Sequence, residues 1–137
     1  MNEHFERYFK THDKRPIFIY AHGNDGDRTE SHRRNLCVNL NNLGYHVFAI
    51  DYRGFGDSSG WPSEDGVVKD VLVLFNFLKS YQNQSKIFLW GHSLGTGISA
   101  HAAKILSEFN CKIFFFYFPK SFFFQKINSK LHRTELS

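Results

Sequence analysis

Residues 86–97 read KIFLWGHSLGTG and decide the fold. A short apolar run leads into Gly-x-Ser-x-Gly at residues 91–95, and a stretch with helical spacing follows. A serine on a sharp strand-to-helix turn needs small neighbours, because its backbone is strained, and the turn aims a helix N-terminus at it. The pattern alone occurs by chance as an ordinary turn capped by serine. In its strand–turn–helix setting, it predicts that Ser93 is a nucleophile at a sheet edge.

Further strands and helices are expected on both sides of this turn. The expected strands are residues 16–21, 45–51, 86–90 and 111–118. The expected helices carry apolar residues at helical spacing over 36–43, 67–78 and 98–109. Gly44 ends the first helix, and Ser63 caps the second, with Glu64 and Asp65 in its first turn. Continuous rather than alternating apolarity indicates strands covered on both faces. The order β-α-β-α-β-α-β predicts an α/β fold, a mostly parallel sheet with helices on both faces.

The loop after the first strand reads HGNDG at residues 22–26. An oxyanion hole needs two converging backbone N–H donors, one after the nucleophile and one from a neighbouring loop. We expect Leu94 to supply the first and Asn24 the second. Considered alone, the loop is better explained as an Asx or glycine turn, and the serine motif reverses that preference. His92 directly precedes Ser93 and is interpreted as an elbow residue rather than as a general base.

A glycine-punctuated loop, DYRGFGDS at residues 51–58, follows the second strand. Its glycines permit tight backbone packing. We expect Arg53 to lock this loop by pairing with Asp51 or Asp57. Asp51 ends a strand, as a catalytic acid would, but we interpret it as structural.

Charge and composition exclude several classes of protein. The 137-residue chain suits one domain, and its net charge of +4 comes entirely from residues 104–137. Neither a basic face nor a nucleic-acid-binding module is visible, so nucleic acid is not an expected partner. Cys37 and Cys111 fit no metal or redox spacing, and no cofactor is expected. Since no signal peptide or membrane-spanning run is visible, the chain is expected to be cytoplasmic or peripheral to a membrane.

Four motifs carry a resemblance to a known superfamily. They are HGN at 22–24, LGYHV at 43–47, DYRGFGDS at 51–58 and WGHSLGTG at 90–97. Over residues 16–113 the sequence resembles the α/β-hydrolases, and among them the branch of lysophosphatidylserine and monoacylglycerol lipases. The resemblance implies that Ser93 attacks a fatty-acyl ester to form an acyl-enzyme, with Asn24 and Leu94 as oxyanion donors. It further implies a lipid or acyl-ester substrate, peripheral membrane contact, and a location at the endoplasmic reticulum membrane.

The sequence after Ser93 departs from this pattern. In this fold, the catalytic acid and then the histidine follow the nucleophile, on loops after later strands. The downstream candidates are Glu108, Glu135, His101 and His132. His101 and Glu108 are expected on the helix that starts at the elbow, pointing away from its mouth. Glu135 and His132 belong to a tail in which seven of the 16 phenylalanines fall between Phe114 and Phe124.

Three segments are therefore expected. Residues 1–15 form a lead-in, 16–113 form the N-terminal half of a hydrolase domain, and 114–137 form a divergent, basic tail. By resemblance the chain is a serine ester hydrolase, but without a triad acid and base we expect the 137 residues to be inactive. Two alternatives stay open: a catalytically incomplete product that binds lipid or a partner, and a relative of acyl-protein thioesterases.

Overall fold

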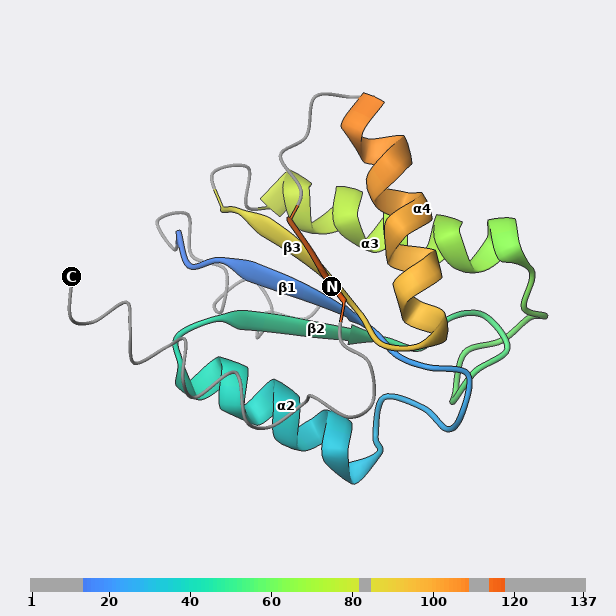
Figure 1. The fold of residues 1–137 in the computed structure, drawn as a ribbon, viewed down its shortest axis with the longest axis horizontal. Helices are drawn as coiled ribbons and strands as arrows, with labels where there is room; N and C mark the ends of the chain where they lie inside the picture. Colours follow the sequence, from blue (N-terminus) through green and yellow to red (C-terminus); the bar gives the residue numbers. More distant parts are fainter. Residues whose placement is uncertain (1–13, 82–84, 109–113, 118–137) are drawn as a thin grey trace.

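The structure is a computed structural model that describes residues 14–81, 85–108 and 114–117. Strands and helices alternate along these residues, as the sequence predicts (Figure 1). The strands are β1 (Ile17–Ala21), β2 (His46–Ile50), β3 (Ile87–Gly91) and β4 (Phe114–Tyr117). The helices are α2 (Ser31–Asn42), α3 (Glu64–Tyr81) and α4 (Leu94–Glu108). For the last expected strand, 111–118, positions 111–113 and 118 lie outside the described residues.

The strands form one parallel sheet in the order β2-β1-β3-β4. Helix α2 covers one face of this sheet, and α3 and α4 cover the other (Figure 1). This arrangement confirms the expected α/β fold with helices on both faces.

Strand β1 is buried along its whole length because it contributes to the core on both faces of the sheet. Ile17, Ile19 and Ala21 pack on the side of α3 and α4. Phe18 and Tyr20 pack on the opposite side, with α2. This alternation is the two-residue period of a strand. It explains why an uninterrupted apolar run was the correct signal for β1.

The helix ends agree with the sequence signals, with one exception. Gly44 follows α2 with a φ of +86°, a conformation that favours glycine. The Ser63 hydroxyl accepts a hydrogen bond from the Gly66 N–H at 3.2 Å and so caps α3. Leu43 was expected to extend the apolar stripe of α2. It lies beyond the last helical residue instead and is 49% exposed.

The strand register brings three loops to one edge of the sheet. Ala21 at the end of β1 aligns with Ile50 of β2 and with Gly91 of β3. The residues that follow these strands therefore meet at the same carboxyl edge. The loop after β1 leads to α2, and the loop after β3 leads to α4 on the opposite face (Figure 1). A crevice where neighbouring connections diverge in this way is the usual ligand site of an open α/β sheet.

Candidate active site

Ser93 lies on a strained turn between β3 and α4. Its φ is +54°, and among the described residues it is the only non-glycine residue with a positive φ. The turn is closed by the Gly95 N–H donating to His92 O at 3.0 Å and the Thr96 N–H donating to Ser93 O at 2.9 Å. Strain of this kind persists where the surrounding structure fixes it, and such residues cluster at functional sites. Ser93 is also exposed, as an attacking group must be.

The two glycines of the motif are explained by close backbone contacts. A Cβ on Gly95 would lie 1.9 Å from the Ala21 carbonyl oxygen. A Cβ on Gly91 would lie 2.4 Å from the Gly95 carbonyl oxygen. The start of α4 therefore packs directly against the end of β1, and only glycine permits that approach.

Gly95 and Gly97 provide a matched pair of substitutions. Gly95→Ala is expected to lower the free energy of unfolding by about 3 kcal/mol or more, because the new methyl group meets rigid backbone. A Cβ on Gly97 meets nothing within 4 Å. Gly97→Ala is therefore expected to raise stability by up to about 1 kcal/mol, through helix propensity. Urea denaturation followed by circular dichroism measures both. Equal stability of the two variants would contradict the close approach of α4 to β1.

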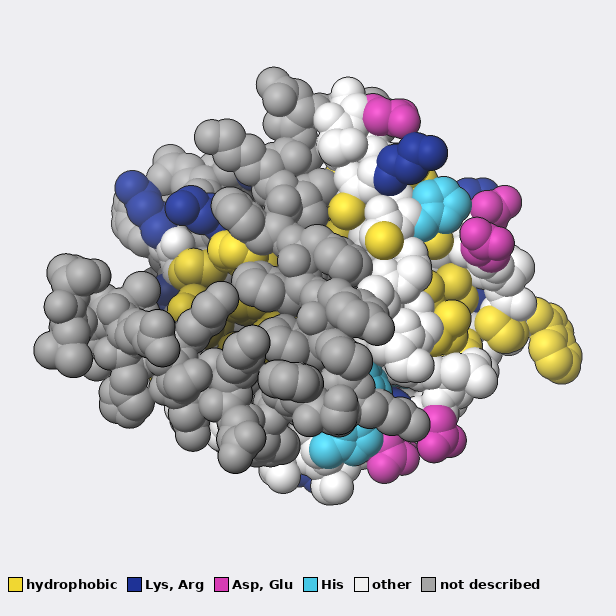
Figure 2. Space-filling model, viewed as in Figure 1, with side chains coloured by type: hydrophobic (Ala, Val, Ile, Leu, Met, Phe, Trp, Pro, Cys, Tyr) yellow, Lys and Arg dark blue, Asp and Glu magenta, His cyan; other side chains and the backbone are white. Residues whose placement is uncertain are grey.

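The loop after β1 lies against the turn that carries Ser93. A Cβ on Gly23 would be 3.3 Å from the Ser93 Cβ and 3.6 Å from His92 O. Asn24 and Leu94, the two expected oxyanion donors, line one cavity of about 470 Å³. Apolar side chains of the 51–58 loop, α3 and α4 line most of the rest: Phe55, Val67, Val68 and Ile98. Hydrophobic side chains gather between the start of α3 and the start of α4 (Figure 2).

The expectation that His101 points away from the mouth of the elbow is wrong. His101 lines the same cavity as Leu94, because it is seven residues, or about two turns, further along α4. Its Nδ1 lies 3.8 Å from Oε1 of Glu64 on α3. Glu108 is exposed and is the last residue of α4. Glu135 and His132 lie outside the described residues.

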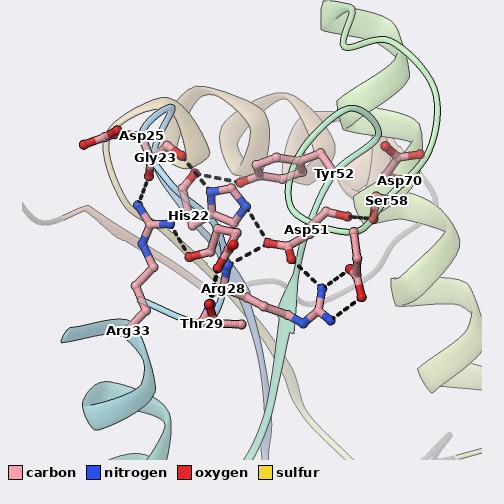
Figure 3. Close-up of polar contacts among 12 residues, drawn as sticks. His22, Gly23, Asp25, Arg28, Thr29, Arg33, Asp51, Tyr52, Ser58 and Asp70 are labelled. Atoms are coloured by element: carbon pink, nitrogen blue, oxygen red, sulfur yellow. Dashed lines mark hydrogen bonds and ion pairs between the residues drawn. The ribbon is translucent and has the colours of Figure 1, made fainter. Parts of the chain in front are cut away.

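Arg53 was expected to pair with Asp51 or Asp57, and this expectation is wrong. Its guanidinium binds Asp70 of α3, with Nη2 2.7 Å from Oδ1, and its backbone N–H donates to Oδ2 at 2.9 Å. Arg28 pairs with Asp51 and, through Nη1 at 2.8 Å from Oδ1, with Asp57. Both acids of the loop are therefore paired, but with a cation from another loop; Figure 3 shows the pair of Arg28 with Asp51. The hydrogen bond from Arg28 lowers the pKa of the Asp57 carboxyl.

The burial of Asp51 explains why this residue has so many polar partners. The Asp51 side chain is 2% exposed. Its Oδ1 accepts the Arg28 backbone N–H at 2.7 Å, and the Ser58 hydroxyl donates to its backbone carbonyl at 2.8 Å. A buried carboxylate is tolerated only with such partners. Asp51 therefore fixes the loop after β1 to the loop after β2.

His22 is the residue whose part in this site the sequence did not reveal. Its side chain is fully buried, with Nδ1 2.6 Å from Gly23 O and Nε2 3.0 Å from Asp51 Oδ1. The Tyr52 hydroxyl donates to His22 O at 2.9 Å, and burial raises the pKa of Tyr52, so it stays protonated. The HGN motif signalled a loop with special backbone geometry, but not the contact between its histidine and Asp51.

Comparison with known proteins decides the family. A family model described as "Serine aminopeptidase, S33" matches residues 12–114. The chain belongs to the serine aminopeptidase S33 family. The human protein ABHD12B is 44% identical to this chain over 101 residues, which are 74% of this chain and 28% of ABHD12B. The rat lysophosphatidylserine lipase ABHD12 is 46% identical over 93 residues, 68% of this chain and 23% of that protein.

This chain therefore spans about a quarter of the length of these relatives. The structure of Est1E from Butyrivibrio proteoclasticus, solved with ferulic acid bound, has a TM-score of 0.64 at 24% identity. That similarity covers 72% of this chain and 41% of Est1E, and it supports the α/β-hydrolase fold. Among the described residues, no helix combines the length and apolarity needed to cross a bilayer.

Proposed function

We propose that this chain carries the nucleophile and oxyanion hole of a serine hydrolase that cleaves fatty-acyl esters. The observation that carries the proposal is the positive φ of Ser93 on a turn that lies against Gly23. Ser93 Oγ attacks the ester carbonyl while a base accepts its proton. The N–H groups of Asn24 and Leu94 stabilise the resulting oxyanion. Loss of the alcohol leaves an acyl-enzyme, which water hydrolyses to the free acid.

The shape and chemistry of the cavity support an acyl chain as the substrate group. It begins at the two proposed oxyanion donors and is lined mainly by apolar side chains. Its volume of about 470 Å³ lies within the range of small-molecule sites. Relatives named lysophosphatidylserine lipase support the same class of substrate.

The triad acid and base are proposed to lie outside residues 1–137. To complete the triad, residues 1–113 can be joined to the segment of human ABHD12B that follows its matched region. We call this protein the extended chain. It keeps every described residue from 14 to 108 and adds the later strands on which the acid and histidine of this fold lie.

A substrate panel on the extended chain separates the proposed function from its alternatives. Lysophosphatidylserine, a monoacylglycerol and an acyl thioester are compared by kcat/KM. We expect the two oxygen esters to be hydrolysed faster than the thioester. Preference for the thioester would favour the acyl-protein thioesterase alternative. Binding of these lipids without turnover of any of them would favour the catalytically incomplete, lipid-binding alternative.

The proposed oxyanion role belongs to the backbone of Asn24, and this makes it testable by proline. Asn24→Pro removes the N–H and is expected to lower kcat of the extended chain about 10²–10³-fold. Asn24→Ala keeps the N–H, and because the Asn24 side chain is exposed, it is expected to change kcat less than about 5-fold. Equal losses in the two variants would assign the effect to the side chain and contradict the backbone role.

Peripheral membrane contact is proposed through Trp61. This side chain is 90% exposed and directly precedes Pro62, which lines the cavity. The second tryptophan, Trp90, is 5% exposed. Phosphatidylcholine vesicles are therefore expected to shift the tryptophan emission of the chain to shorter wavelength, and Trp61→Phe is expected to abolish that shift. An unshifted spectrum in the parent chain would contradict membrane contact at this position. Location at the endoplasmic reticulum membrane remains part of the same proposal.

A further inference from the structure

We infer that His22 is a positioning residue that orients the Gly23–Asn24 peptide, so that the Asn24 N–H faces the cavity. The inference rests on the proposed function, because it explains how one of the two proposed oxyanion donors is aimed. Asp51 is the anchor that holds the His22 ring in place for this task. His22, Gly23 and Asp51 lie side by side at the ends of β1 and β2 (Figure 3).

The planarity of the peptide bond links the His22 ring to the Asn24 N–H. In a trans peptide, the C=O of one residue and the N–H of the next point in opposite directions. No described peptide bond is cis. Gly23 O lies 2.6 Å from Nδ1 of His22, so the carbonyl of this peptide is turned toward the ring. The Asn24 N–H is consequently directed away from the ring, and Asn24 lines the cavity.

The two ring nitrogens have different partners. A carbonyl oxygen only accepts hydrogen bonds, so Nδ1 must donate to Gly23 O. On the other side of the ring, Nε2 lies 3.0 Å from Asp51 Oδ1. Asp51 is itself held in place, because its oxygens accept from the backbone N–H and the guanidinium of Arg28.

The ring of His22 adjoins a connected cluster of charged side chains. Arg28 is the cation, and Asp51 and Asp57 are the carboxylates, of this cluster. Two aromatic rings also pack against the ring of His22. Their centroids lie 4.7 Å (Tyr52) and 5.5 Å (Phe55) from that of His22. Together these contacts hold the ring in one orientation.

Two conservative substitutions separate the two ring contacts. The side-chain amide of Asn can place an N–H near the position of Nδ1, and the longer amide of Gln can place one near Nε2. His22→Asn therefore keeps a donor for Gly23 O and gives up the contact with Asp51. His22→Gln keeps the contact with Asp51 and gives up the donor for Gly23 O. If His22 only filled space in the core, there would be no reason for His22→Asn to preserve the orientation of the Gly23–Asn24 peptide and for His22→Gln to lose it.

The test is nuclear magnetic resonance on the ¹⁵N-labelled 137-residue chain at neutral pH. In the parent chain, we expect Nδ1 of His22 to show the signal of a protonated nitrogen, because it faces a carbonyl oxygen. We expect the backbone order parameter of Asn24 to be near the rigid value of about 0.85. His22→Gln is expected to lower it to below about 0.6, and His22→Asn is expected to restore the rigid value.

Three results would overturn the inference. An unprotonated Nδ1 in the parent chain would remove its basis, and this measurement needs no variant to fold. An Asn24 amide as rigid in His22→Gln as in the parent would show that the Gly23 contact does not orient the peptide. Equal disorder in both variants would assign His22 to general packing. None of these readouts depends on hydrolysis. Failure of the proposed function is read separately, by substitution of Ser93 in the extended chain.

Discussion

The purified 137-residue chain is expected to hydrolyse p-nitrophenyl butyrate no faster than its own Ser93→Ala variant. The extended chain is expected to exceed it by at least about 10³-fold in kcat/KM. The physical reason is that a serine hydroxyl is a weak nucleophile at neutral pH without an adjacent base. The described residues supply the strained turn, both proposed N–H donors and the cavity. None of these elements removes the proton from Ser93 Oγ.

The contrary result has a specific structural meaning. If the 137-residue chain itself hydrolyses the ester and Ser93→Ala removes that activity, a histidine within the chain reaches the nucleophile. His101 is then the first to substitute, because it lines the cavity that Leu94 also lines. Loss of activity in His101→Ala, with retention in Lys104→Ala as an exposed control on the same helix, would identify His101 as the base. The proposal that the base lies outside residues 1–137 would then be wrong.

Ser93→Ala in the extended chain is expected to lower kcat by roughly four to six powers of ten. The remaining rate over water comes from the oxyanion hole and from substrate binding. KM is expected to change little, because Ser93 is not among the residues that line the proposed acyl cavity. Steady-state kinetics with p-nitrophenyl butyrate measure both constants.

Ser93→Gly is the matched control for this variant. It removes the same hydroxyl but relieves the positive φ of +54°, which glycine adopts without a steric penalty. Ser93→Gly is therefore expected to be as inactive as Ser93→Ala and more stable than it by about 1–2 kcal/mol. Retained activity in either variant would contradict the assignment of Ser93 as the nucleophile. Equal stabilities would contradict a strained turn at this position.

The fold and the strained turn at Ser93 were predictable because their signals are local in the sequence. A continuous apolar run marked β1, and two glycines around Ser93 marked a close approach of backbone to backbone. The orientation of His101 follows from the helical period, because it lies seven residues from Leu94 and therefore on the same face of α4. Its distance along the helix axis does not give its direction around that axis, and the expected orientation was wrong for this reason.

The charged partners were not predictable, because they are brought together by the sheet and not by the chain. Arg28 and Asp51 are 23 residues apart, and Arg53 and Asp70 are 17 apart. Nearness in sequence favoured pairing Arg53 with the acids of its own loop. The parallel register instead places the loop after β1 beside the loop after β2, and Arg28 pairs with both Asp51 and Asp57 there. The contact between His22 and Asp51 arises from the same register.

The most direct measurement is labelling of the extended chain with a fluorophosphonate probe, followed by mass spectrometry of its tryptic peptides. The account predicts one probe per chain, covalently bound to Ser93, and no labelling of the 137-residue chain or of the extended Ser93→Ala variant. Such a probe reports a nucleophile that is both activated and placed beside its oxyanion donors. An extended chain that hydrolyses esters while the probe is bound to another residue, or to none, would contradict the central claim that Ser93 is the nucleophile.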